Sequence, residues 1–433
     1  MDTAIEPKKT YEVSKGQALS ILIVMTVLYT INYADRSILS IVLQQIKVTL
    51  EISDTQLGVV QSVFSIGLGL FTIPLAWLVD RWSRRKAVGL MALLWSAATF
   101  ATGLAWNFAS LVFARAFVGL GEDGFSTSGS GWLSLAYKKE KRGLVTGIFG
   151  IGSVLGTAMG MIIGGILVAR TGMWQIPFYV FAVPGVIFGI WAFFLKDYKS
   201  VKEEGESGLS KKYLANWIGL FKIKSFTFTT LGQVCFGLYV FTWIGWLPAF
   251  MIRGYNIDAG QAGTIVGLIA VVAALGSPLG GWLADRWNKK SRGGRGYMMA
   301  LVQLINFILL GFIVYFLGRI SIPILIVLLA VQMIVVAAVN PLIFSIITDI
   351  APTSHRIAGQ GMMVTFVYAA GAALGPWIVG AVSDAVGGGA EGIRAGFLWL
   401  LPVLLLCVIF YAINSKYYPD DSERVSDLVY SEK

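Results

Sequence analysis

The stretch SLVFARAFVGLGEDGFSTSGSGWLSLAY, Ser110–Tyr137, decides the fold class of this chain. It is long enough to cross a bilayer, because about 20 mostly apolar residues suffice for a spanning helix. Its interior nevertheless carries Arg115, Glu122 and Asp123. A charged side chain at the centre of a spanning helix costs roughly 2.5–3.5 kcal/mol on insertion scales. We therefore expect these side chains to face a protein interior or a water-filled cavity.

The first apolar stretch of the chain also contains charge at its centre. It includes Asp35 and Arg36 within the sequence TINYADR, residues 30–36. In the Ser110–Tyr137 stretch, Arg115 and Glu122 are two helical turns apart and so project from the same face. Two sets of acidic and basic groups at positions where charge is costly predict a polar pathway through a membrane protein.

The composition of the whole chain supports this class. Of 433 residues, 56% are hydrophobic and 13% are charged, whereas soluble domains have about 25% charged residues. The net charge of +10 does not indicate a nucleic-acid partner, because the Lys and Arg residues lie in short loops beside apolar stretches. The single histidine and two cysteines, Cys235 and Cys407, imply neither a metal site nor a disulfide framework.

Twelve apolar segments have spanning length, in two sets of six separated by one polar linker. They lie near 17–45, 55–80, 87–107, 109–137, 142–169, 174–196, 226–254, 260–285, 297–317, 322–349, 356–384 and 393–414. We predict an all-α polytopic membrane protein with twelve transmembrane helices in two six-helix bundles. The predicted parts are an N-terminal tail (1–16), a first bundle (17–196), a linker (197–224), a second bundle (225–414) and a C-terminal tail (415–433).

The distribution of cations predicts the orientation of these helices. Clusters of Lys and Arg occupy alternate loops, at 81–86, 138–142, 196–224 and 286–292, and the intervening loops carry few cations. Loops rich in Lys and Arg face the cytoplasm. Both tails and the linker are therefore expected on the cytoplasmic side, as an even number of spans requires. We expect a bacterial inner membrane.

Two loops repeat one motif at equivalent places in the two sets. Residues 74–86 read PLAWLVDRWSRRK and residues 280–290 read GGWLADRWNKK. An Asp-Arg pair followed by cations indicates a duplicated six-span unit. This pattern resembles the signature Gly-x-Leu-Ala-Asp-Arg-x-Gly-Arg-Arg/Lys of the major facilitator superfamily, although Ala76 and Ser83 replace its two glycines in the first copy. The resemblance implies a central cavity and alternating access by rocking of two halves.

Two further motifs resemble particular groups of that superfamily. Asn32-Tyr33-x-Asp35-Arg36 and Arg115-x-x-x-Gly119-x-Gly121-Glu122 are similar to motifs of the anion:cation symporters and of the spinster-like transporters. The former import sugar acids and other organic anions with protons, and the latter include carriers of lysolipids and sphingoid phosphates. The sequence EDGFST, residues 122–127, resembles the spinster-like Glu-Ala-Ser-Tyr-Ser-Thr, with Asp123 in place of Ala.

The two central acids are our candidates for proton coupling. Burial disfavours the charged form of a carboxylate, whereas a nearby Arg favours it. We predict that Asp35 and Glu122 carry protons and exchange ion-pair partners with Arg36 and Arg115 as substrate arrives; the resemblance implies the same roles. The alternative is that Asp35–Arg115 or Arg36–Glu122 is a static salt bridge between spans one and four. Which of Asp35, Glu122 and Asp123 titrates stays open.

An anionic substrate follows from the two central arginines. A guanidinium group matches carboxylate, sulfonate or phosphate with two parallel hydrogen bonds, so Arg36 and Arg115 are predicted to bind the substrate together with the nearby Tyr33. The second half should contribute neutral contacts, since its spans carry no central charge. The candidates are Tyr239, Trp243, Asn340 and Tyr368, each of which can instead be an ordinary interhelical contact.

The repeated loops predict a gate on the cytoplasmic side. Its candidate residues are Asp80, Arg81, Arg84, Asp285 and Arg286, which we expect to close that side when the carrier opens outward. The Gly-rich fifth span, with seven glycines between 147 and 165, is expected to pack closely against its neighbours.

The predicted function is proton-coupled symport of a small organic anion, such as a carboxylate or sugar acid, by a monomer in the lipid bilayer. No enzyme activity and no cofactor are expected; Gly119-x-Gly121-x-x-Gly124 lies inside a span and not after a strand, so we interpret it as helix packing. The alternative is spinster-like transport of lysophospholipid or sphingoid-type lipids. A compact polar cavity favours the first, and a long aromatic and aliphatic groove open to lipid favours the second. A receptor or channel on this fold is a third, weaker alternative.

Overall fold

The computed structural model describes residues 14–81, 83–122, 125–197, 219–291, 293–351 and 356–431. These residues form helices and short turns, and no strand occurs among them. The all-helical prediction is therefore confirmed for the part of the chain that is described. Most of the predicted linker, 198–218, lies outside it.

The described residues of the first half form seven α-helices that correspond to the first six predicted spans. They are α1 (Lys15–Leu50), α2 (Asp54–Arg81), α3 (Arg84–Gly103), α4 (Phe108–Glu122), α5 (Phe125–Ala136), α6 (Arg142–Thr171) and α7 (Ile176–Ala192). A short 3-10 turn, η1 (Lys139–Lys141), precedes α6. The fourth predicted span is divided between α4 and α5, on either side of residues 123–124, which lie outside the described residues.

The second half supplies the other six predicted spans. Its helices are α9 (Lys224–Tyr255), α10 (Ala259–Ala273), α11 (Gly276–Asn288), α12 (Gly294–Phe316), α13 (Ile322–Ala337), α14 (Val339–Ile350), α15 (Arg356–Phe366), α16 (Ala373–Ala385) and α17 (Gly389–Ser431). One π-helical turn, η3 (Val367–Ala372), joins α15 to α16. The last helix continues beyond the predicted end of its span at 414, so that residues 415–431 of the predicted tail are helical.

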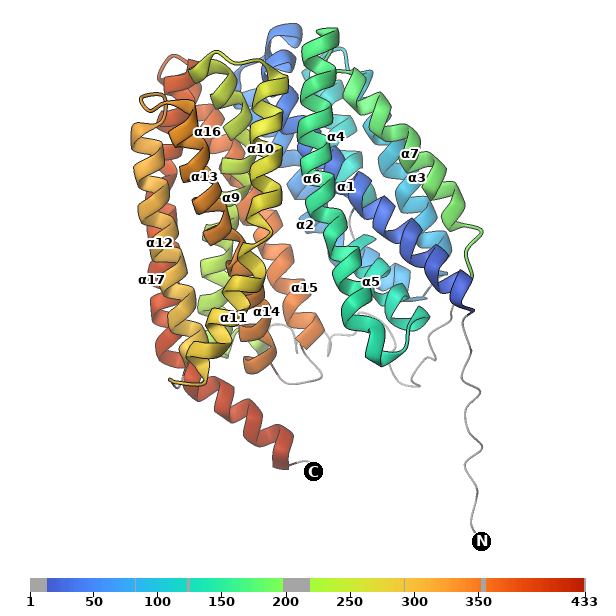
Figure 1. Ribbon diagram of the computed structural model, residues 1–433, viewed down its shortest axis with the longest axis vertical. Coiled ribbons are helices and arrows are strands. Elements are labelled where there is room, and N and C mark those ends of the chain that lie inside the picture. The colour runs from blue at the N-terminus through green and yellow to red at the C-terminus, as the bar shows by residue number, and fades with distance from the viewer. Residues whose placement is uncertain are drawn as a thin grey trace.

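The helices gather in two bundles that lie side by side (Figure 1). In the first bundle α1 packs on α6, α3 on α7, and α2 on α4. In the second bundle α17 packs on α9, α12 and α16. The two bundles meet chiefly where α6 packs on α10 and α2 on α16. Eight of the described helical stretches are long and apolar enough to cross a membrane.

The glycines of α6 permit the close packing that the sequence predicts. A Cβ atom on Gly156 or Gly160 would overlap a backbone oxygen of α1, belonging to Thr30 and Ala34 respectively. A Cβ atom on Gly165 would overlap the backbone oxygen of Ala259 in α10. Small residues at these points let the two helix backbones approach each other directly. The predicted role of the Gly-rich fifth span is thus confirmed.

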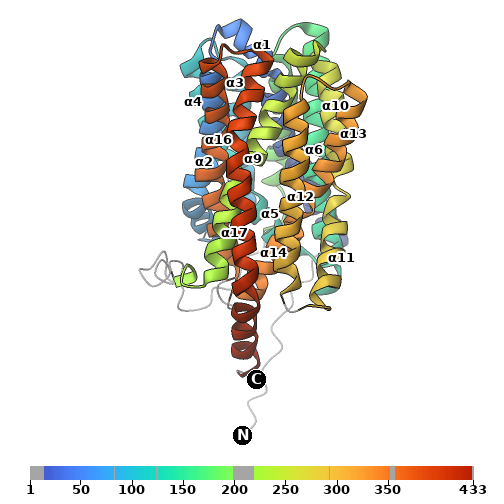
Figure 2. The same cartoon turned by 90° about the vertical axis from the view of Figure 1, so that its left-hand side faces the viewer.

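The two ends of the molecule differ in how the bundles meet. We call the end with the start of α1 and the end of α17 the terminal end, and the opposite end the sealed end (Figures 1 and 2). Toward the sealed end, Gly165 of α6 contacts α10, but Gly147 and Gly150 have nothing within 4 Å beside their own helix. Beyond α10, α11 packs mainly on α12, α13 and α14 of its own bundle. The bundles therefore touch at the sealed end, and α6 has no close neighbour at Gly147 and Gly150 toward the terminal end.

Candidate functional site

Two ion pairs join the middle of α1 to α4. Arg36 Nε lies 2.6 Å from Glu122 Oε2, and Arg115 Nη1 lies 3.4 Å from Asp35 Oδ1. Asp35 and Arg36 are neighbours in α1, while Arg115 and Glu122 are two turns apart in α4, so each helix contributes one acid and one base. The structure thus brings together all four charged residues that the sequence singles out, in the two pairings that the static salt-bridge alternative also proposed.

The four side chains differ in exposure. The side chains of Asp35 and Arg115 are each 1% exposed and that of Glu122 is 0% exposed, whereas the Arg36 side chain is 21% exposed. Burying an ion pair is costly unless its geometry is good and its other hydrogen bonds are made. Arg36 is therefore the one of these four side chains with appreciable exposed surface, and it lies where Tyr368 of the second bundle meets the cluster.

Aromatic side chains surround the Arg36 guanidinium. Its carbon lies 4.9 Å from the ring centre of Tyr33 and 5.4 Å from that of Phe64 in α2, and Arg115 also lies over Phe64, at 5.1 Å. Cations are attracted to aromatic faces at these distances. The second bundle reaches the cluster through Tyr368, whose hydroxyl oxygen is 3.5 Å from Arg36 Nη1. Aromatic rings therefore surround the guanidinium, and Glu122 is the acid that pairs with it among the described residues.

Tyr368 owes its position to the π-helical turn η3. Such turns insert one residue into a helix and are frequent at functional sites. The Tyr368 ring packs 5.2 Å from that of Phe241 in α9 and against a small apolar cluster of the first bundle, formed by Phe64, Leu68, Ala98 and Val118. The predicted participation of Tyr368 is consistent with this contact, although its role toward a substrate stays a prediction.

Thr99 of α3 is a member of the cluster that sequence reasoning missed. Its hydroxyl donates a 2.6 Å hydrogen bond to Asp35 Oδ2, and both side chains are buried. Ser96, Thr99 and Thr102 recur at intervals of three in an otherwise apolar span, which is the one signal in the sequence that a polar face exists there. Nothing in the sequence shows which of the three meets Asp35.

Some polar atoms of the cluster make no hydrogen bond to the described residues. They are Glu122 Oε1, Arg115 Nε and the side-chain nitrogen of Asn32. Buried polar atoms are nearly always paired in folded proteins. Because Glu122 Oε1 and Arg115 Nε can each form one more hydrogen bond, the cluster can accept a further partner.

Sequence comparison places this site in a known family. Residues 25–322 match the family model of the Major Facilitator Superfamily. The chain belongs to the major facilitator superfamily. It is therefore an integral membrane transporter and not an enzyme, and its fold is the predicted one of two six-helix bundles.

Relatives within the superfamily transport various solutes. The hexuronate transporter of Bacillus subtilis is 24% identical over 85% of this chain and 89% of its own length. The probable sulfoacetate transporter of Cupriavidus necator is 28% identical over 63% of this chain and 66% of its own. Among solved structures, an inward-facing, unoccupied bacterial homologue of the human lysosomal transporter spinster superposes with a TM-score of 0.81. It is 21% identical, and the match covers 94% of this chain and 99% of that one.

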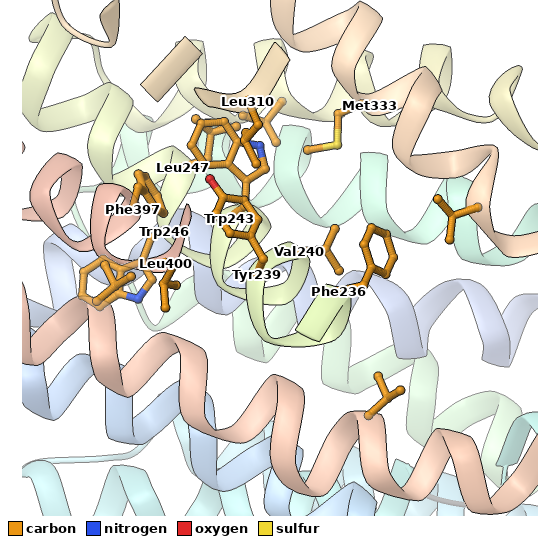
Figure 3. Close-up of a cluster of buried hydrophobic side chains, with 14 of the residues drawn as sticks. Phe236, Tyr239, Val240, Trp243, Trp246, Leu247, Leu310, Met333, Phe397 and Leu400 are labelled. Carbon is orange, nitrogen blue, oxygen red and sulfur yellow. The ribbon is translucent and has the colours of Figure 1, made fainter. Parts of the chain in front are cut away.

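Two of the predicted substrate contacts lie in a buried aromatic group. Tyr239 and Trp243 are buried in the core of the second bundle, with their rings 6.3 Å apart and Trp243 4.7 Å from the ring of Phe397 (Figure 3). Both side chains are buried in this conformation, and their contact with a substrate stays a prediction. Asn340, near the start of α14, is exposed. No hydrogen bond joins it to the cluster among the described residues.

The predicted gate residues of the second bundle pair within that bundle. Arg295 of α12 lies 2.7 Å from Asp285 and 2.6 Å from Asp349, and the Tyr418 hydroxyl donates to Asp349. Arg286 lies over the ring of Trp282 in its own helix, at 5.6 Å. We call the group Asp285, Arg295, Asp349 and Tyr418 the terminal-end network.

The gate residues of the first bundle are described only in part. The side chains of Asp80 and Arg81 lie outside the described part of the chain, and Arg84 begins α3. Their predicted role in closing the terminal end therefore stays a prediction.

A second charged network, at the sealed end, was not predicted. The fully buried carboxylate of Asp54 accepts two hydrogen bonds of 2.8 Å from Arg253, one of 2.6 Å from Lys47 and one of 2.7 Å from Ser383. Asp384 accepts hydrogen bonds from the backbone N–H groups of Asp54 and Thr55, at 3.0 and 2.7 Å. We call these residues the sealed-end network.

The sealed-end network joins the two bundles. Lys47 and Asp54 belong to α1 and α2, whereas Arg253, Ser383 and Asp384 belong to α9 and α16. Asp384 also satisfies the free N–H groups at the start of α2, where the helix dipole favours negative charge. In the sequence these residues resemble ordinary charges at the ends of spans, because nothing local shows that Asp54 and Arg253 meet.

Proposed function

We propose that this chain is a proton-coupled symporter of a small organic anion that works by alternating access. The observation that carries the proposal is the unequal exposure of the Arg36–Glu122 pair: the side chain of the base is 21% exposed, beside Tyr368 of the second bundle, and that of the acid is 0% exposed. A substrate carboxylate that binds Arg36 competes directly with Glu122. A buried carboxylate that loses its counter-charge takes up a proton, so the binding of anion and proton become linked.

The surroundings of Arg36 suit a compact anion. Its guanidinium can bind carboxylate, sulfonate or phosphate through two parallel hydrogen bonds, and Tyr33, Phe64 and Tyr368 provide flat surfaces from three helices. The relatives named for hexuronate and sulfoacetate support this class of substrate. Of the two acids predicted for proton coupling, Glu122 competes directly with the substrate for Arg36, whereas Asp35 is paired with the enclosed Arg115.

The orientation in the membrane determines the side to which the present conformation opens. The cation-rich loops lie at the terminal end, which by the positive-inside rule is the cytoplasmic side. The present conformation then opens inward, toward the cytoplasm of a bacterial inner membrane. For substrate to enter from outside, the sealed-end network must part while the terminal end closes.

Transport of a lysolipid is the second candidate. The observation that favours it is an aromatic series beside Tyr33, in which Tyr29 stacks on Phe149 at 4.3 Å and on Phe125 at 6.3 Å. These rings come from α1, α5 and α6, on the terminal side of the ion pairs. An acyl chain could pack along them with its charged headgroup on Arg36.

Uptake into proteoliposomes tests the proposal. With an imposed pH gradient, wild-type protein should accumulate a hexuronate such as galacturonate, and Glu122→Gln should abolish that accumulation while counterflow exchange continues. Glu391→Gln, which alters an exposed acid at the sealed end paired with Arg394, is the matched control and should transport normally.

Two results would contradict the proposal. Normal pH-driven accumulation by Glu122→Gln would remove this acid from the coupling mechanism. Movement of fluorescent lysophospholipid between leaflets, with no uptake of any small organic anion, would establish the lipid alternative.

A further inference from the structure

We infer that the two buried acids are unequal: Thr99 and Arg115 hold Asp35 as a fixed negative charge, and Glu122 alone exchanges a proton. One proton then accompanies one monoanion, and transport is electroneutral. This inference rests on the proposed symport function and specifies its stoichiometry and the charge of its substrate.

Both oxygens of Asp35 are occupied. Arg115 contacts Oδ1 and the Thr99 hydroxyl donates to Oδ2, and all three side chains are buried. A hydrogen-bond donor and a positive charge directed at a carboxylate both favour its charged form. Because Arg115 is 1% exposed, a substrate between the bundles cannot draw it away from Asp35 in this conformation.

Glu122 has the opposite surroundings. Its Oε2 is paired with Arg36 and its Oε1 makes no hydrogen bond to the described residues. The other groups whose charge acts on it are Asp35 from α1 and Arg115 from its own helix; Tyr33 and Tyr368 complete the ring around Arg36. Asp123 follows directly and lies outside the described residues. The ion-pair partner of Glu122 is therefore Arg36, the cation of the cluster that the substrate is proposed to bind.

The charges of the cluster determine the stoichiometry. Among the described residues at this depth, Asp35 and Glu122 cancel Arg36 and Arg115. A monoanion on Arg36 adds one negative charge, and one proton from water, placed on Glu122, restores neutrality. A dianion would leave one uncompensated charge in a buried site, which is costly. The site should accordingly select monoanions over dianions.

Purified protein in proteoliposomes gives the direct test, with galacturonate as the monoanion and sulfoacetate as the dianion. A pH gradient of one unit at zero membrane potential should accumulate galacturonate about tenfold. A membrane potential set with valinomycin and potassium, without a pH gradient, should cause no accumulation. The initial rate of sulfoacetate uptake at equal concentration should be lower than that of galacturonate.

Potential-driven accumulation of galacturonate, or a factor of about a hundred per pH unit, would mean two protons and would overturn the inference. Equal initial rates of uptake for sulfoacetate and galacturonate would also overturn it. The proposed function itself fails only if a pH gradient drives no anion at all, so the two failures are distinct. Asp123→Asn should leave transport electroneutral; a change to potential-driven uptake in that variant would also contradict the assignment.

Substitution of Thr99 tests the positioning role. Thr99→Val removes the donor at similar volume, so Asp35 should become able to bind a second proton, membrane potential should begin to drive uptake and the pH profile of uptake should move. Thr99→Ser keeps the hydroxyl and should behave like wild type. Thr102→Val is the matched control, because Thr102 is equally buried in α3 but donates to the backbone oxygen of Ala98.

Identical pH profiles for Thr99→Val and Thr99→Ser would remove Thr99 from this role. If Thr99→Val yields no folded protein, the potential dependence of the wild type and of Thr99→Ser still decides the stoichiometry.

Discussion

The networks at the two ends of the molecule use the same groups in opposite ways. At the sealed end, Asp54 of the first bundle binds Arg253 of the second, so the carboxylate fixes one bundle to the other. At the terminal end, Asp285 and Asp349 share Arg295, and all three belong to the second bundle. An acid that finds its base across the interface closes one end of a carrier. An acid that finds its base within its own bundle leaves the other end free to open.

The two networks also differ in burial, and therefore in the free energy that depends on each ion pair. The Asp54 side chain is 0% exposed, whereas that of Asp285 is 60% exposed. Removing one partner of a buried ion pair costs about 3–5 kcal/mol because the other charge stays buried alone. An exposed pair contributes only about 0–1 kcal/mol. The conformation should therefore depend on Asp54 far more than on Asp285.

The largest expected effect is that of Asp54→Asn. The change leaves Lys47 and Arg253 without their shared counter-charge, so the equilibrium should move toward a state open at the sealed end, by up to about 3–5 kcal/mol. Electron–electron distances between spin labels at the exposed residues Val48 and Val386 should lengthen, once Cys235 and Cys407 have been replaced. An unchanged distance distribution would show that the sealed-end network does not hold the bundles together.

A smaller shift in the same direction is expected for Asp384→Asn. The N–H groups of Asp54 and Thr55 bond to different oxygens of Asp384, so the single amide oxygen of Asn can accept from only one of them. The other hydrogen bond is lost and the remaining one loses its ionic character, at a cost of roughly 1–3 kcal/mol. The same pair of labels should report a partial population of the longer distance. A shift as large as that of Asp54→Asn would mean that the start of α2, and not the Asp54 ion pairs, closes this end.

The smallest effect is expected for Asp285→Asn in the terminal-end network. Arg295 keeps its pair with Asp349, so thermal unfolding should change by no more than about 1 kcal/mol and the Val48–Val386 distance should not change. If this substitution moved the conformational equilibrium as far as Asp54→Asn does, the contrast between the two ends would be lost.

The predicted spans and central charges show how far the sequence leads. Each of the twelve predicted apolar segments corresponds to helical structure, because the bilayer imposes length and hydrophobicity on a spanning helix in a way that is readable locally. The four charged residues of α1 and α4 could be selected for the same reason: a charge in an apolar span needs a partner or a cavity. Family membership followed from the repeated loop motif.

Pairing was beyond the reach of the sequence. Spacing placed Arg115 and Glu122 on one face of a helix and allowed Asp35–Arg115 or Arg36–Glu122 as salt bridges, but it could not show that both pairs form together. Nor could it show that Thr99 would meet Asp35, or that Tyr239 and Trp243 would turn into the core of their own bundle. Each of these outcomes depends on the rotation and depth of a helix relative to its neighbours, which side-chain packing of both helices sets together.

The sequence by itself determined what this protein is made of: apolar spans in a repeated set of six, charge confined to a few costly positions, and cations gathered at one end. These are local consequences of transferring residues from water to lipid. Only the tertiary structure decided which acid pairs with which base. That pairing determines which base is left exposed and which end is closed. Those properties arise between residues as distant in the chain as Asp54 and Arg253, whose contact no local rule requires.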